Sequence, residues 1–472
     1  MRCLLPCHPA LNVFTIENNM LKADFIKQIT ELMPNEAEAL LSVLQTEPVV
    51  SVRVNTRKQE VTQAVNPVKW CEAGRYLEGR PQFTFDPLFH AGQYYVQDAS
   101  SMFLYHILKQ ISEGDVRYLD LCAAPGGKTT TAIEALSNDS LVVANEIDYS
   151  RAQILRENVI KWGAPNVMVL NDTPKKIGKM KNFFDIISAD MPCSGEGMFR
   201  KEEEAVRQWT PSLVEQCAER QKSILDDVWS ALRPGGYFIY STCTFNQSEN
   251  EDIAKLIVEE YGAEPVDIQI DPTWKITSAI GTDIPCYRFM PHKTKGEGLF
   301  VAVFRKAGSR ARFEPKPIKK KGKNVPVPKG CADFLSRKMI LDVDTETVNA
   351  YLPDLALAMH YVKANANAIL CGVEVAQIKG KDVVPAHALS QSILLNRDAF
   401  TCYDVDYKTA IAYLRGEQIV LPQEVNKGFV LITYTDVPLG WVKNLGNRAN
   451  NLYPKEWRIR SIATPETPPR VL

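Results

Sequence analysis

Long hydrophobic runs are absent from this chain of 472 residues. None approaches the roughly 18 consecutive apolar residues that a membrane-spanning helix needs. The opening stretch up to Pro9 is too short and too broken by proline to act as a signal peptide. We therefore expect a cytoplasmic protein with no membrane partner. At about 150 residues per domain, the length excludes a single core and predicts about three units.

A strong net charge is also absent. The 55 Lys and Arg residues nearly balance the 56 Asp and Glu residues, which leaves a formal charge of −1. This balance argues against a protein that coats nucleic acid indiscriminately, because such binding needs an excess of clustered basic residues. Any contact with RNA must come from local patches, although charge alone fits solvated surfaces equally well. The visible patches are residues 316–323 and the C-terminal set Lys443, Arg448, Lys455, Arg458 and Arg460.

Cysteine is not scarce, but a regular cysteine spacing is lacking. The eleven cysteines are odd in number and scattered, which favours a reducing compartment over a disulfide framework. No closely spaced Cys or His pair recurs, so we expect no metal site. Cys3, Cys7 and His8 lie in residues 1–19, which show no periodicity. We expect this extension to be disordered or to precede the true start at Met20.

Short apolar runs alternate with helical patterns from Asp115 onward, which is typical of a parallel α/β sheet. Helices are expected to begin at Thr129 and Ser150, and a third to end at Leu232 before Arg-Pro-Gly-Gly. Ser248 and Glu251 have the spacing of a capping box that opens another helix. The expected strands are residues 116–121, 141–144, 167–170, 184–189, 237–241 and 299–304.

Composition divides the rest of the chain. The run of Pro, Lys and Gly over residues 307–330 holds almost no large apolar residue, so it cannot bury a core and predicts a basic linker. Alternating residues near 429–434 and 438–442 predict short strands. The expected units are an α+β segment over residues 20–100, an α/β domain over 101–306, an intermediate segment over 331–387 and a small β-rich module over 388–472.

A glycine-containing turn follows the first expected strand. It lies where open α/β sheets bind ligands, and Gly126 and Gly127 permit the backbone to turn tightly and approach a ligand. The turn has neither the spacing of a phosphate loop nor that of a dinucleotide-binding loop, so it is weak evidence alone. The residues predicted to bind a cofactor here are Cys122, Ala123, Ala124, Pro125, Gly126, Gly127 and Lys128.

Acidic residues follow the next strands. Glu146 ends the second strand, where a carboxylate can accept both hydroxyl groups of a ribose. Asp172 follows the third strand and can accept from an adenine amino group, and Asp190 ends the fourth. A single such acid could be a solvated loop residue or a helix cap, as we expect for Asp148. Acids at successive strand ends favour a ligand that carries a nucleoside.

Two cysteines follow the fourth and fifth strands: Cys193 in Asp190-Met-Pro-Cys-Ser-Gly and Cys243 in Ser241-Thr-Cys-Thr-Phe. Neighbouring strands should bring them together on one rim. Carbon 5 of cytosine accepts a methyl group only after a thiolate adds at carbon 6, and Asp190 near N3 would stabilise the developing charge as a general acid. A base must then remove the C5 proton. The cysteines expected to be inert core residues are Cys71, Cys122, Cys217, Cys286, Cys331, Cys371 and Cys402.

These motifs strongly resemble those of the Nop/Sun family of RNA cytosine-C5 methyltransferases, and within it the bacterial ribosomal small-subunit methyltransferase F group. The resemblance covers most of residues 20–462. The segments that carry it are Ser51-Val-Arg-Val-Asn, Gly92-Gln-Tyr-Tyr-Val-Gln-Asp-Ala-Ser-Ser, Cys122 to Lys128, Asp190-x-Pro-Cys-Ser-Gly, Ser241-Thr-Cys and Pro291-His-Lys-x-Lys-Gly-Glu-Gly-x-Phe300.

The resemblance implies a Rossmann-like sheet that binds S-adenosylmethionine, an N-terminal RNA-binding segment over residues 20–100 and a C-terminal PUA-like RNA-binding module. It implies that Cys243 is the nucleophile, that Cys193 aids product release, and that Glu146, Asp172 and Asp190 line the cofactor pocket. The expected product is 5-methylcytosine in 16S ribosomal RNA, with ribosomal RNA or the small subunit as partner of a monomer. Methylation of tRNA and a non-catalytic role in ribosome assembly remain open alternatives.

Overall fold

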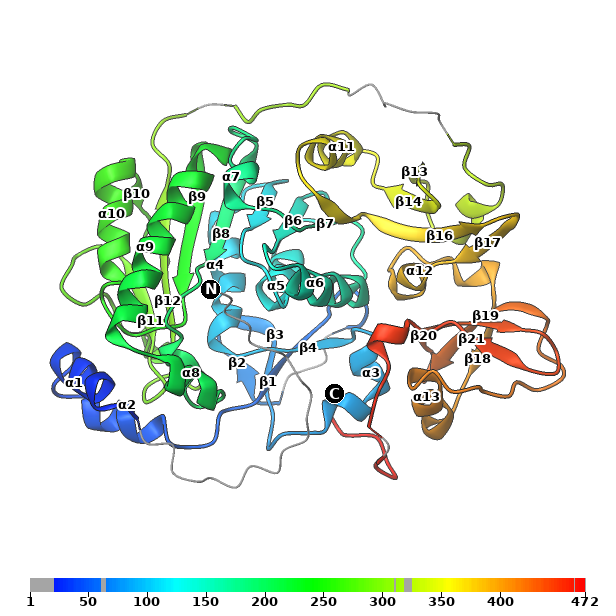
Figure 1. Ribbon diagram of the computed structural model, residues 1–472, viewed down its shortest axis with the longest axis horizontal. Helices are drawn as coiled ribbons and strands as arrows, with labels where there is room; N and C mark the ends of the chain where they lie inside the picture. Colours follow the sequence, from blue (N-terminus) through cyan, green and yellow to red (C-terminus); the bar gives the residue numbers. More distant parts are fainter. Residues whose placement is uncertain (1–20, 61–64, 310, 318–324, 462, 472) are drawn as a thin grey trace.

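The computed structural model describes residues 21–60, 65–309, 311–317, 325–461 and 463–471. The extension over residues 1–19 and most of the basic patch over 316–323 lie outside the described residues. In the part of the chain that is described, the strands form four sheets, arranged from the N-terminal helices across a large central sheet to the C-terminal module (Figure 1). No helix among those described is both long enough and apolar enough to span a bilayer.

Two helices and a small antiparallel sheet form the N-terminal part. Helix α1 (Ala23–Leu32) buries Phe25 and Ile29, and α2 (Ala37–Val43) buries Leu40. The sheet has the order β2-β3-β1-β4. Its strands are β1 (Ser51–Val54), β2 (Pro67–Val68), β3 (Cys71–Tyr76) and β4 (Tyr94–Val96), and the short helix α3 (Pro87–His90) precedes β4.

The central sheet has the order β10-β12-β9-β8-β5-β6-β7-β15, with β11 paired to β12. Strands β5 to β9 run parallel, whereas β10, β11, β12 and β15 run antiparallel to their neighbours. Strand order reverses between β5 and β8, the point where such sheets bind ligands. The bounds are β5 (Arg117–Asp120), β6 (Leu141–Asn145), β7 (Val167–Leu170), β8 (Phe184–Asp190), β9 (Leu232–Thr242), β10 (Glu264–Pro265), β11 (Cys286–Phe289), β12 (Leu299–Arg305) and β15 (Ala368–Cys371).

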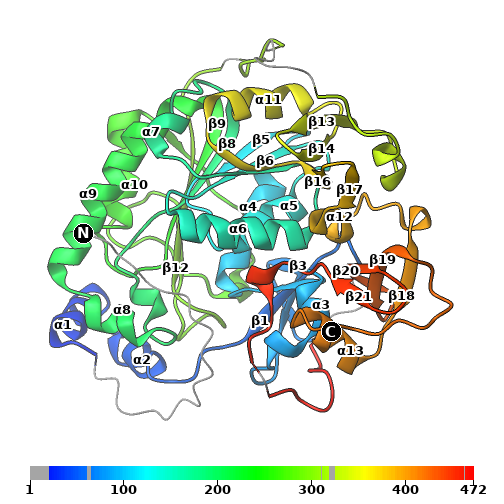
Figure 2. The same ribbon diagram turned by 45° about the vertical axis from the view of Figure 1, so that its right-hand side comes forward.

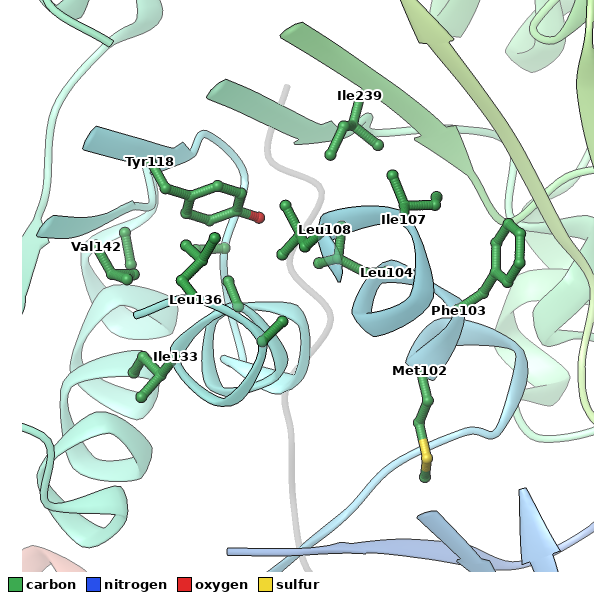
Figure 3. Close-up of a cluster of buried hydrophobic side chains, with 14 of the residues drawn as sticks. Met102, Phe103, Leu104, Ile107, Leu108, Tyr118, Ile133, Leu136, Val142 and Ile239 are labelled. Atoms are coloured by element: carbon green, nitrogen blue, oxygen red, sulfur yellow. The ribbon is translucent and has the colours of Figure 1, made fainter. Parts of the chain in front are cut away.

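Helices cover both faces of this sheet (Figure 2). Neighbouring residues of β5 point to opposite faces: Tyr118 lies in the core with α4 and α5, whereas Leu119 lies in the core with α9 and α10. Figure 3 shows the first of these cores, with α4 and α5 between the strands. The helices are α4 (Phe103–Ile111), α5 (Gly127–Ala135) and α6 (Tyr149–Trp162) on one face, and α7 (Pro174–Ile177), α9 (Pro211–Val228) and α10 (Glu251–Tyr261) on the other; α8 (Glu203–Gln208) lies near α1.

Two local predictions in this region are wrong. The helix expected to end at Leu232 is α-helical to Val228 and continues as a 3-10 turn to Ala231, so its end is close to the prediction. The glycines after it are not a stop before the strand: they belong to β9, where Gly235 and Gly236 exchange backbone hydrogen bonds with Lys306. The capping box is also wrong, since α10 begins at Glu251 and Asn250 precedes it. The Glu251 carboxylate instead binds the buried Arg288 side chain, which would be costly to leave unpaired.

The residues after the linker are built partly into the central sheet. Strand β15 extends that sheet by pairing with β7, and α11 (Ala356–Asn365) packs on the face that carries α9. The apolar cluster around Cys331 continues into the C-terminal module through Leu389 and Trp441. A third sheet consists of β13 (Ile340–Asp344), β14 (Thr347–Tyr351), β16 (Val373–Lys379) and β17 (Asp382–Pro385), followed by α12 (His387–Gln391).

The C-terminal sheet has the order β18-β19-β20-β21. Its core includes Phe85 and Ala91 of the N-terminal part, so the module is packed against the body of the protein. The predicted strands near residues 429–434 and 438–442 are present as β19 and β20. The elements are β18 (Thr401–Asp404), α13 (Tyr407–Leu414), β19 (Gly428–Tyr434), β20 (Val437–Asn444) and β21 (Ala449–Asn451).

Candidate active site

The two motif cysteines meet at the carboxyl ends of β8 and β9. These strands are parallel neighbours, and the register pairs Asp190 with Ser241. Each cysteine lies in the loop that follows its strand, and the sulfur atoms of Cys193 and Cys243 lie 3.2 Å apart. Hydrogen bonding to Cys243, together with burial, raises the pKa of the Cys193 thiol well above its ordinary value. Cys193 is therefore held as a thiol that can donate a proton toward the sulfur of Cys243.

Asp190 lies at the same rim and is fixed by two donors. The ammonium of Lys128 lies 2.8 Å from Oδ2, and the Ser241 hydroxyl donates to Oδ1 at 2.9 Å. Burial opposes the charge on Lys128, but the Asp190 carboxylate raises the pKa of Lys128 above its ordinary value, and Cys243 adds to the effect. Lys128 thus reaches from the glycine turn to the cysteines, whereas the sequence predicted for it a role in cofactor binding.

Asp120 was not predicted as a site residue, although it ends β5 at the switch point of the sheet. Its side chain is fully buried, and burial raises the pKa of this carboxyl to about 7. Thr129 donates to Oδ2 at 2.6 Å, whereas Oδ1 has no hydrogen-bond partner among the described residues. The signal in the sequence is its place as the last residue of the first parallel strand.

Glu146 lies at the end of β6 with a side chain that is 3% exposed. One carboxylate oxygen accepts from the backbone N–H of Asp148 at 3.0 Å, and the other lies 3.4 Å from the guanidinium of Arg151. The neighbouring Ile147 is 61% exposed and offers an apolar surface beside the acid, which the sequence reading missed. Asp148 caps α6 by accepting from the N–H of Arg151, as predicted.

Asp172 is already occupied by protein donors. Lys176 lies 2.8 Å from Oδ2, and the backbone N–H groups of Thr173 and Asn367 donate to the same carboxylate. Although burial opposes it, these contacts lower the pKa of Asp172. A carboxylate offers about four acceptor positions, so few remain for a ligand. Asn367 comes from the segment before β15, which could not be read from the sequence.

The glycine turn between β5 and α5 is held by its neighbours. Gly126 adopts a left-handed conformation with φ 113°, and a Cβ there would lie 3.1 Å from the Leu155 side chain of α6. Arg151 donates to the carbonyl of Ala124, and Asn158 donates to that of Pro125. The left-handed turn therefore requires the glycine, and the close approach of α6 leaves little room for a side chain there.

S-adenosylmethionine carries ribose hydroxyls that need acceptors and an amino-acid tail with an ammonium group. The chain offers the Glu146 carboxylate at one strand end and the unpartnered oxygen of Asp120 at the next. An unpartnered buried carboxylate oxygen is rare in a folded protein, and an ammonium group of a bound ligand would satisfy it. The residues at this rim thus fit the predicted cofactor.

The other residues singled out in the sequence have the following places. Cys402 is exposed, so its assignment to the core is wrong, and Cys122 is half-buried in the glycine turn. The remaining cysteines assigned to the core are buried: Cys71, Cys217, Cys286, Cys331 and Cys371. In the motif Ser51-Val-Arg-Val-Asn, Arg53 and Asn55 are fully buried, and Arg53 donates to Gln97 and to Thr130 of α5. Asn55 donates to the carbonyls of Gly92 and Trp162, the last residue of α6. Arg53 and Asn55 thus hold the N-terminal sheet against α5 and α6.

Sequence profiles of known families match three stretches of the chain. The profile described as 16S rRNA methyltransferase RsmB/F matches residues 106–305. That of the N-terminal domain of 16S rRNA methyltransferase RsmF matches residues 21–99, and that of the methyltransferase RsmF PUA domain matches residues 400–459. The matches therefore include the glycine turn between β5 and α5, both motif cysteines and the C-terminal sheet.

Curated relatives match along nearly the whole length. The ribosomal RNA small subunit methyltransferase F of Erwinia tasmaniensis is 28% identical over an alignment of 464 residues, and the alignment covers 92% of this chain and 95% of the relative. The protein of the same name from Shigella boydii is 29% identical over 460 residues, with the same coverage of both chains. The similarity therefore extends through the linker and the intermediate segment.

Solved structures share the fold. NSun6 from Pyrococcus horikoshii with SFG, an analogue of S-adenosylmethionine, superposes with a TM-score of 0.52 at 20% identity, over 61% of this chain and 99% of that one. A methyltransferase homolog protein from the same organism gives a TM-score of 0.52 at 24% identity, over 61% of this chain and 96% of its own. These similarities support the central sheet and its helices, and the predicted fold class is confirmed.

The predictions of an RNA methyltransferase and of S-adenosylmethionine as its cofactor are confirmed by the family match. The RNA-binding character expected of the C-terminal module agrees with its PUA profile. Profile matches in three successive parts, relatives that align end to end and the paired cysteines at one rim lead to one conclusion: this chain belongs to the RsmB/F family of 16S rRNA methyltransferases.

Proposed function

We propose that this enzyme transfers a methyl group from S-adenosylmethionine to carbon 5 of a cytosine in the RNA of the small ribosomal subunit. The observation that carries the proposal is the 3.2 Å contact between the sulfurs of Cys193 and Cys243 at the rim that also holds Asp190. The names of the curated relatives support ribosomal RNA over tRNA as the substrate. The intact cysteines argue against a non-catalytic binding protein.

The reaction begins with Cys243. Its thiolate adds to carbon 6 of the cytosine, so that a sulfur–carbon bond forms and the electron pair of the C5–C6 double bond moves toward carbon 5 and N3. The ammonium of Lys128 interacts electrostatically with Cys243 and so lies close to the reacting sulfur. The Cys193 thiol can donate to the same sulfur and keeps it oriented.

Asp190 and Lys128 act at N3. As the ring becomes electron-rich, N3 gains basicity, and the Lys128–Asp190 pair can supply it with a proton. The Ser241 hydroxyl fixes the second oxygen of Asp190, so the carboxylate needs little reorganisation during the step. This arrangement stabilises charge at the atom where it develops.

Glu146 and Asp120 hold the methyl donor. S-adenosylmethionine supplies an electrophilic methyl group when bound. Glu146 would accept from the ribose hydroxyls, and Oδ1 of Asp120 would accept from the ammonium group. The exposed Ile147 beside Glu146 would contact the adenine base of S-adenosylmethionine. Asp172 has a smaller part, because Lys176 and two backbone amides already occupy its carboxylate.

Release of the product requires a base and a leaving group. A base removes the proton from carbon 5, the electrons of that C–H bond restore the C5–C6 double bond, and the sulfur of Cys243 leaves. N3 returns its proton to the Lys128–Asp190 pair, so the product is neutral 5-methylcytosine. Cys193 lies next to the departing sulfur, and its thiol proton can stabilise the leaving thiolate. This is the part that we propose for Cys193.

Methyl transfer to RNA that lacks the modification tests the proposal. Labelled S-adenosylmethionine is offered to naked 16S RNA, to small ribosomal subunits and to tRNA, and the product nucleoside is identified by mass spectrometry. We expect 5-methylcytidine in ribosomal RNA or in the subunit. Label on tRNA alone, or on another atom of the base, would contradict the proposal.

The two cysteines are distinguished by trapping. Cys193→Ala should accumulate a protein–RNA adduct that survives denaturation, because addition still occurs and release is impaired. Cys243→Ala should form no adduct. The reverse pattern would exchange the two roles.

Action as a monomer and a cytoplasmic location stay predictions, to be checked by light scattering and by cell fractionation.

A further inference from the structure

Two buried glutamates lie directly behind the cysteines. Glu196 is three residues after Cys193, at the start of the short helix η3 (Glu196–Met198), and Glu249 is six residues after Cys243. Neither side chain is accessible to solvent. The loops that carry the cysteines lie beyond the strand ends, so their backbone N–H groups cannot pair within the sheet and need other acceptors.

Each glutamate binds the backbone of the other cysteine's loop. Glu196 accepts from the N–H groups of Phe245 at 2.7 Å and Asn246 at 3.1 Å, just after Cys243. Glu249 accepts from the N–H of Ser194 at 3.0 Å, immediately after Cys193. The exchange is therefore reciprocal, and it ties the two loops together.

The Asn246 side chain connects the two acids. Its amide donates to Glu196 at 3.0 Å and to Glu249 at 2.8 Å, and its carbonyl oxygen accepts from the N–H of Glu249 at 2.9 Å. Trp209 donates to Glu196 and Gln221 donates to Glu249, which fixes each carboxylate from its outer side. Every one of these donors is placed by a different helix or loop.

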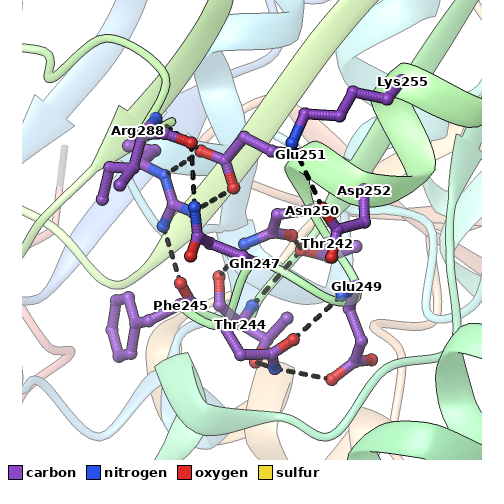
Figure 4. Close-up of polar contacts among 12 residues, drawn as sticks. Thr242, Thr244, Phe245, Gln247, Glu249, Asn250, Glu251, Asp252, Lys255 and Arg288 are labelled. Carbon is purple, nitrogen blue, oxygen red and sulfur yellow. Dashed lines mark hydrogen bonds and ion pairs between the residues drawn. The ribbon is translucent and has the colours of Figure 1, made fainter. Parts of the chain in front are cut away.

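The surroundings add two further constraints. A Cβ on Gly197 would lie 2.7 Å from the carbonyl of Cys243, so only glycine permits the loops to approach this closely. Behind them, Arg288 donates to the carbonyl of Phe245 and to Glu251 (Figure 4). The segment after Cys243 is thus held by two groups: Glu196 binds the N–H of Phe245, and Arg288 binds its carbonyl.

We propose that Glu196 and Glu249 are positioning residues that hold Cys193 and Cys243 at the spacing the reaction needs. The inference rests on the proposed function, since that function gives the spacing its purpose. Burying two carboxylates side by side is costly unless each is well hydrogen-bonded, and apolar residues of the same size could not bind the loop amides. Burial, with the neighbouring Glu196, raises the pKa of Glu249 to about 7, which reflects this cost.

The test compares Glu249→Gln and Glu196→Gln with the wild-type enzyme. Glutamine has nearly the same shape as glutamate, but one carboxylate oxygen is replaced by an NH2 group. That group would face the donors of Ser194, Gln221 or Asn246 and could not accept from them, so the loops should loosen. Turnover in methyl transfer should fall at least roughly tenfold, because misplacing the reacting groups lowers the rate far more than it weakens substrate binding. The Kd for S-adenosylmethionine, measured by calorimetry, should stay unchanged.

A second measurement reports the spacing of the thiols without any methyl transfer. Phenylarsine oxide binds two neighbouring thiols at once, and a preorganised pair binds it more tightly. Its affinity should fall at least roughly tenfold in both glutamine variants. The Cys193→Ser enzyme gives the background, since it lacks the pair. Unchanged arsenical affinity together with unchanged turnover would overturn the proposal.

Asp185→Asn serves as the matched control. Asp185 is also a buried carboxylate on β8, but it lies at the opposite end of the strand and binds Arg233. Its loss should lower the melting temperature without changing arsenical affinity. If a glutamine variant does not fold, Asn246→Ser removes the bridge and keeps both acids, and it should weaken arsenical binding in the same direction; unchanged affinity there would overturn the proposal too.

The outcomes separate this inference from the proposed function. A wild-type enzyme that binds the arsenical through both cysteines but methylates no cytosine would contradict the function. The arsenical affinities of the glutamine variants would still decide whether Glu196 and Glu249 set the spacing of the thiols.

Discussion

The ammonium of Lys128 lies 2.8 Å from Oδ2 of Asp190, so the glycine turn of the cofactor site and the loop of the first cysteine are joined by an ion pair. Both side chains are largely shielded from solvent, with 16% and 34% of their surfaces exposed. In the proposed reaction the pair would connect methyl-donor binding to cytosine activation, since Lys128 follows the glycine turn and Asp190 precedes Cys193. Its removal should therefore affect the chemical step.

Lys128→Met should lower the rate of methyl transfer by roughly 100-fold, because a fixed cation beside the reacting base is lost. Donor affinity should change much less. Single-turnover kinetics and calorimetry measure the two effects separately. Lys179→Met removes an exposed lysine and is the control. A large loss of donor affinity with unchanged single-turnover rate would return Lys128 to the cofactor role predicted from sequence.

Glu146→Ala should weaken the binding of S-adenosylmethionine, since its buried carboxylate is the acceptor proposed for the ribose hydroxyls. Asp148→Ala is the matched control two residues away. It removes the cap of α6 and should cost about 1 kcal/mol of stability without changing donor affinity. Calorimetric titration measures the affinity, and equal Kd values for Glu146→Ala and the wild type would refute this assignment.

Basic residues of the C-terminal module should contribute to RNA binding. Arg448, Lys455 and Arg460 are exposed there. Changing all three to Gln should raise the KM for RNA, leave donor affinity unchanged and make RNA binding less sensitive to salt, because fewer phosphate contacts release fewer counterions. Titrations at several salt concentrations measure this. The control set, Lys27, Lys109 and Lys179, lies on other exposed surfaces and removes the same charge.

His387 should make the folded protein sensitive to acid. Both of its ring nitrogens are buried without a hydrogen-bond partner among the described residues, and Tyr453 and Trp457 contact the ring. Burial, with the nearby charges of Lys161 and Lys58, lowers the pKa of His387 to about 3. The unfolded chain therefore binds the extra proton from the ordinary histidine pKa downward, and stability falls as the pH drops through that range.

Urea unfolding at about pH 8 and about pH 5 checks this prediction. The free energy of unfolding should fall with decreasing pH by up to about 1.4 kcal/mol per pH unit from this group. In His387→Phe the ring contacts are kept and the slope should become shallower, although His90, which is also buried, contributes its own part. An equal slope in both proteins would show that His387 is not the source.

Much of the fold followed from local patterns. The apolar runs over residues 167–170 and 184–189 correspond closely to β7 and β8, because strands buried on both faces are continuous apolar stretches. The cysteine motifs were found the same way, since each directly follows such a strand. Elements with weak local signals were missed: β15 is an edge strand of only four residues and pairs with a strand some 200 positions earlier in the chain.

The sequence by itself determined the succession of parallel strands along the chain, the residue types at their carboxyl ends and the family. These depend on residue types at strand ends, which local patterning and motif spacing specify. Only the tertiary structure decided that Lys128 binds Asp190, that Lys176 and Asn367 occupy Asp172, and that Glu196 and Glu249 join the cysteine loops. The physical reason is that these contacts join residues from separate segments, and a hydrogen bond depends on distance in space, which spacing along the chain does not fix.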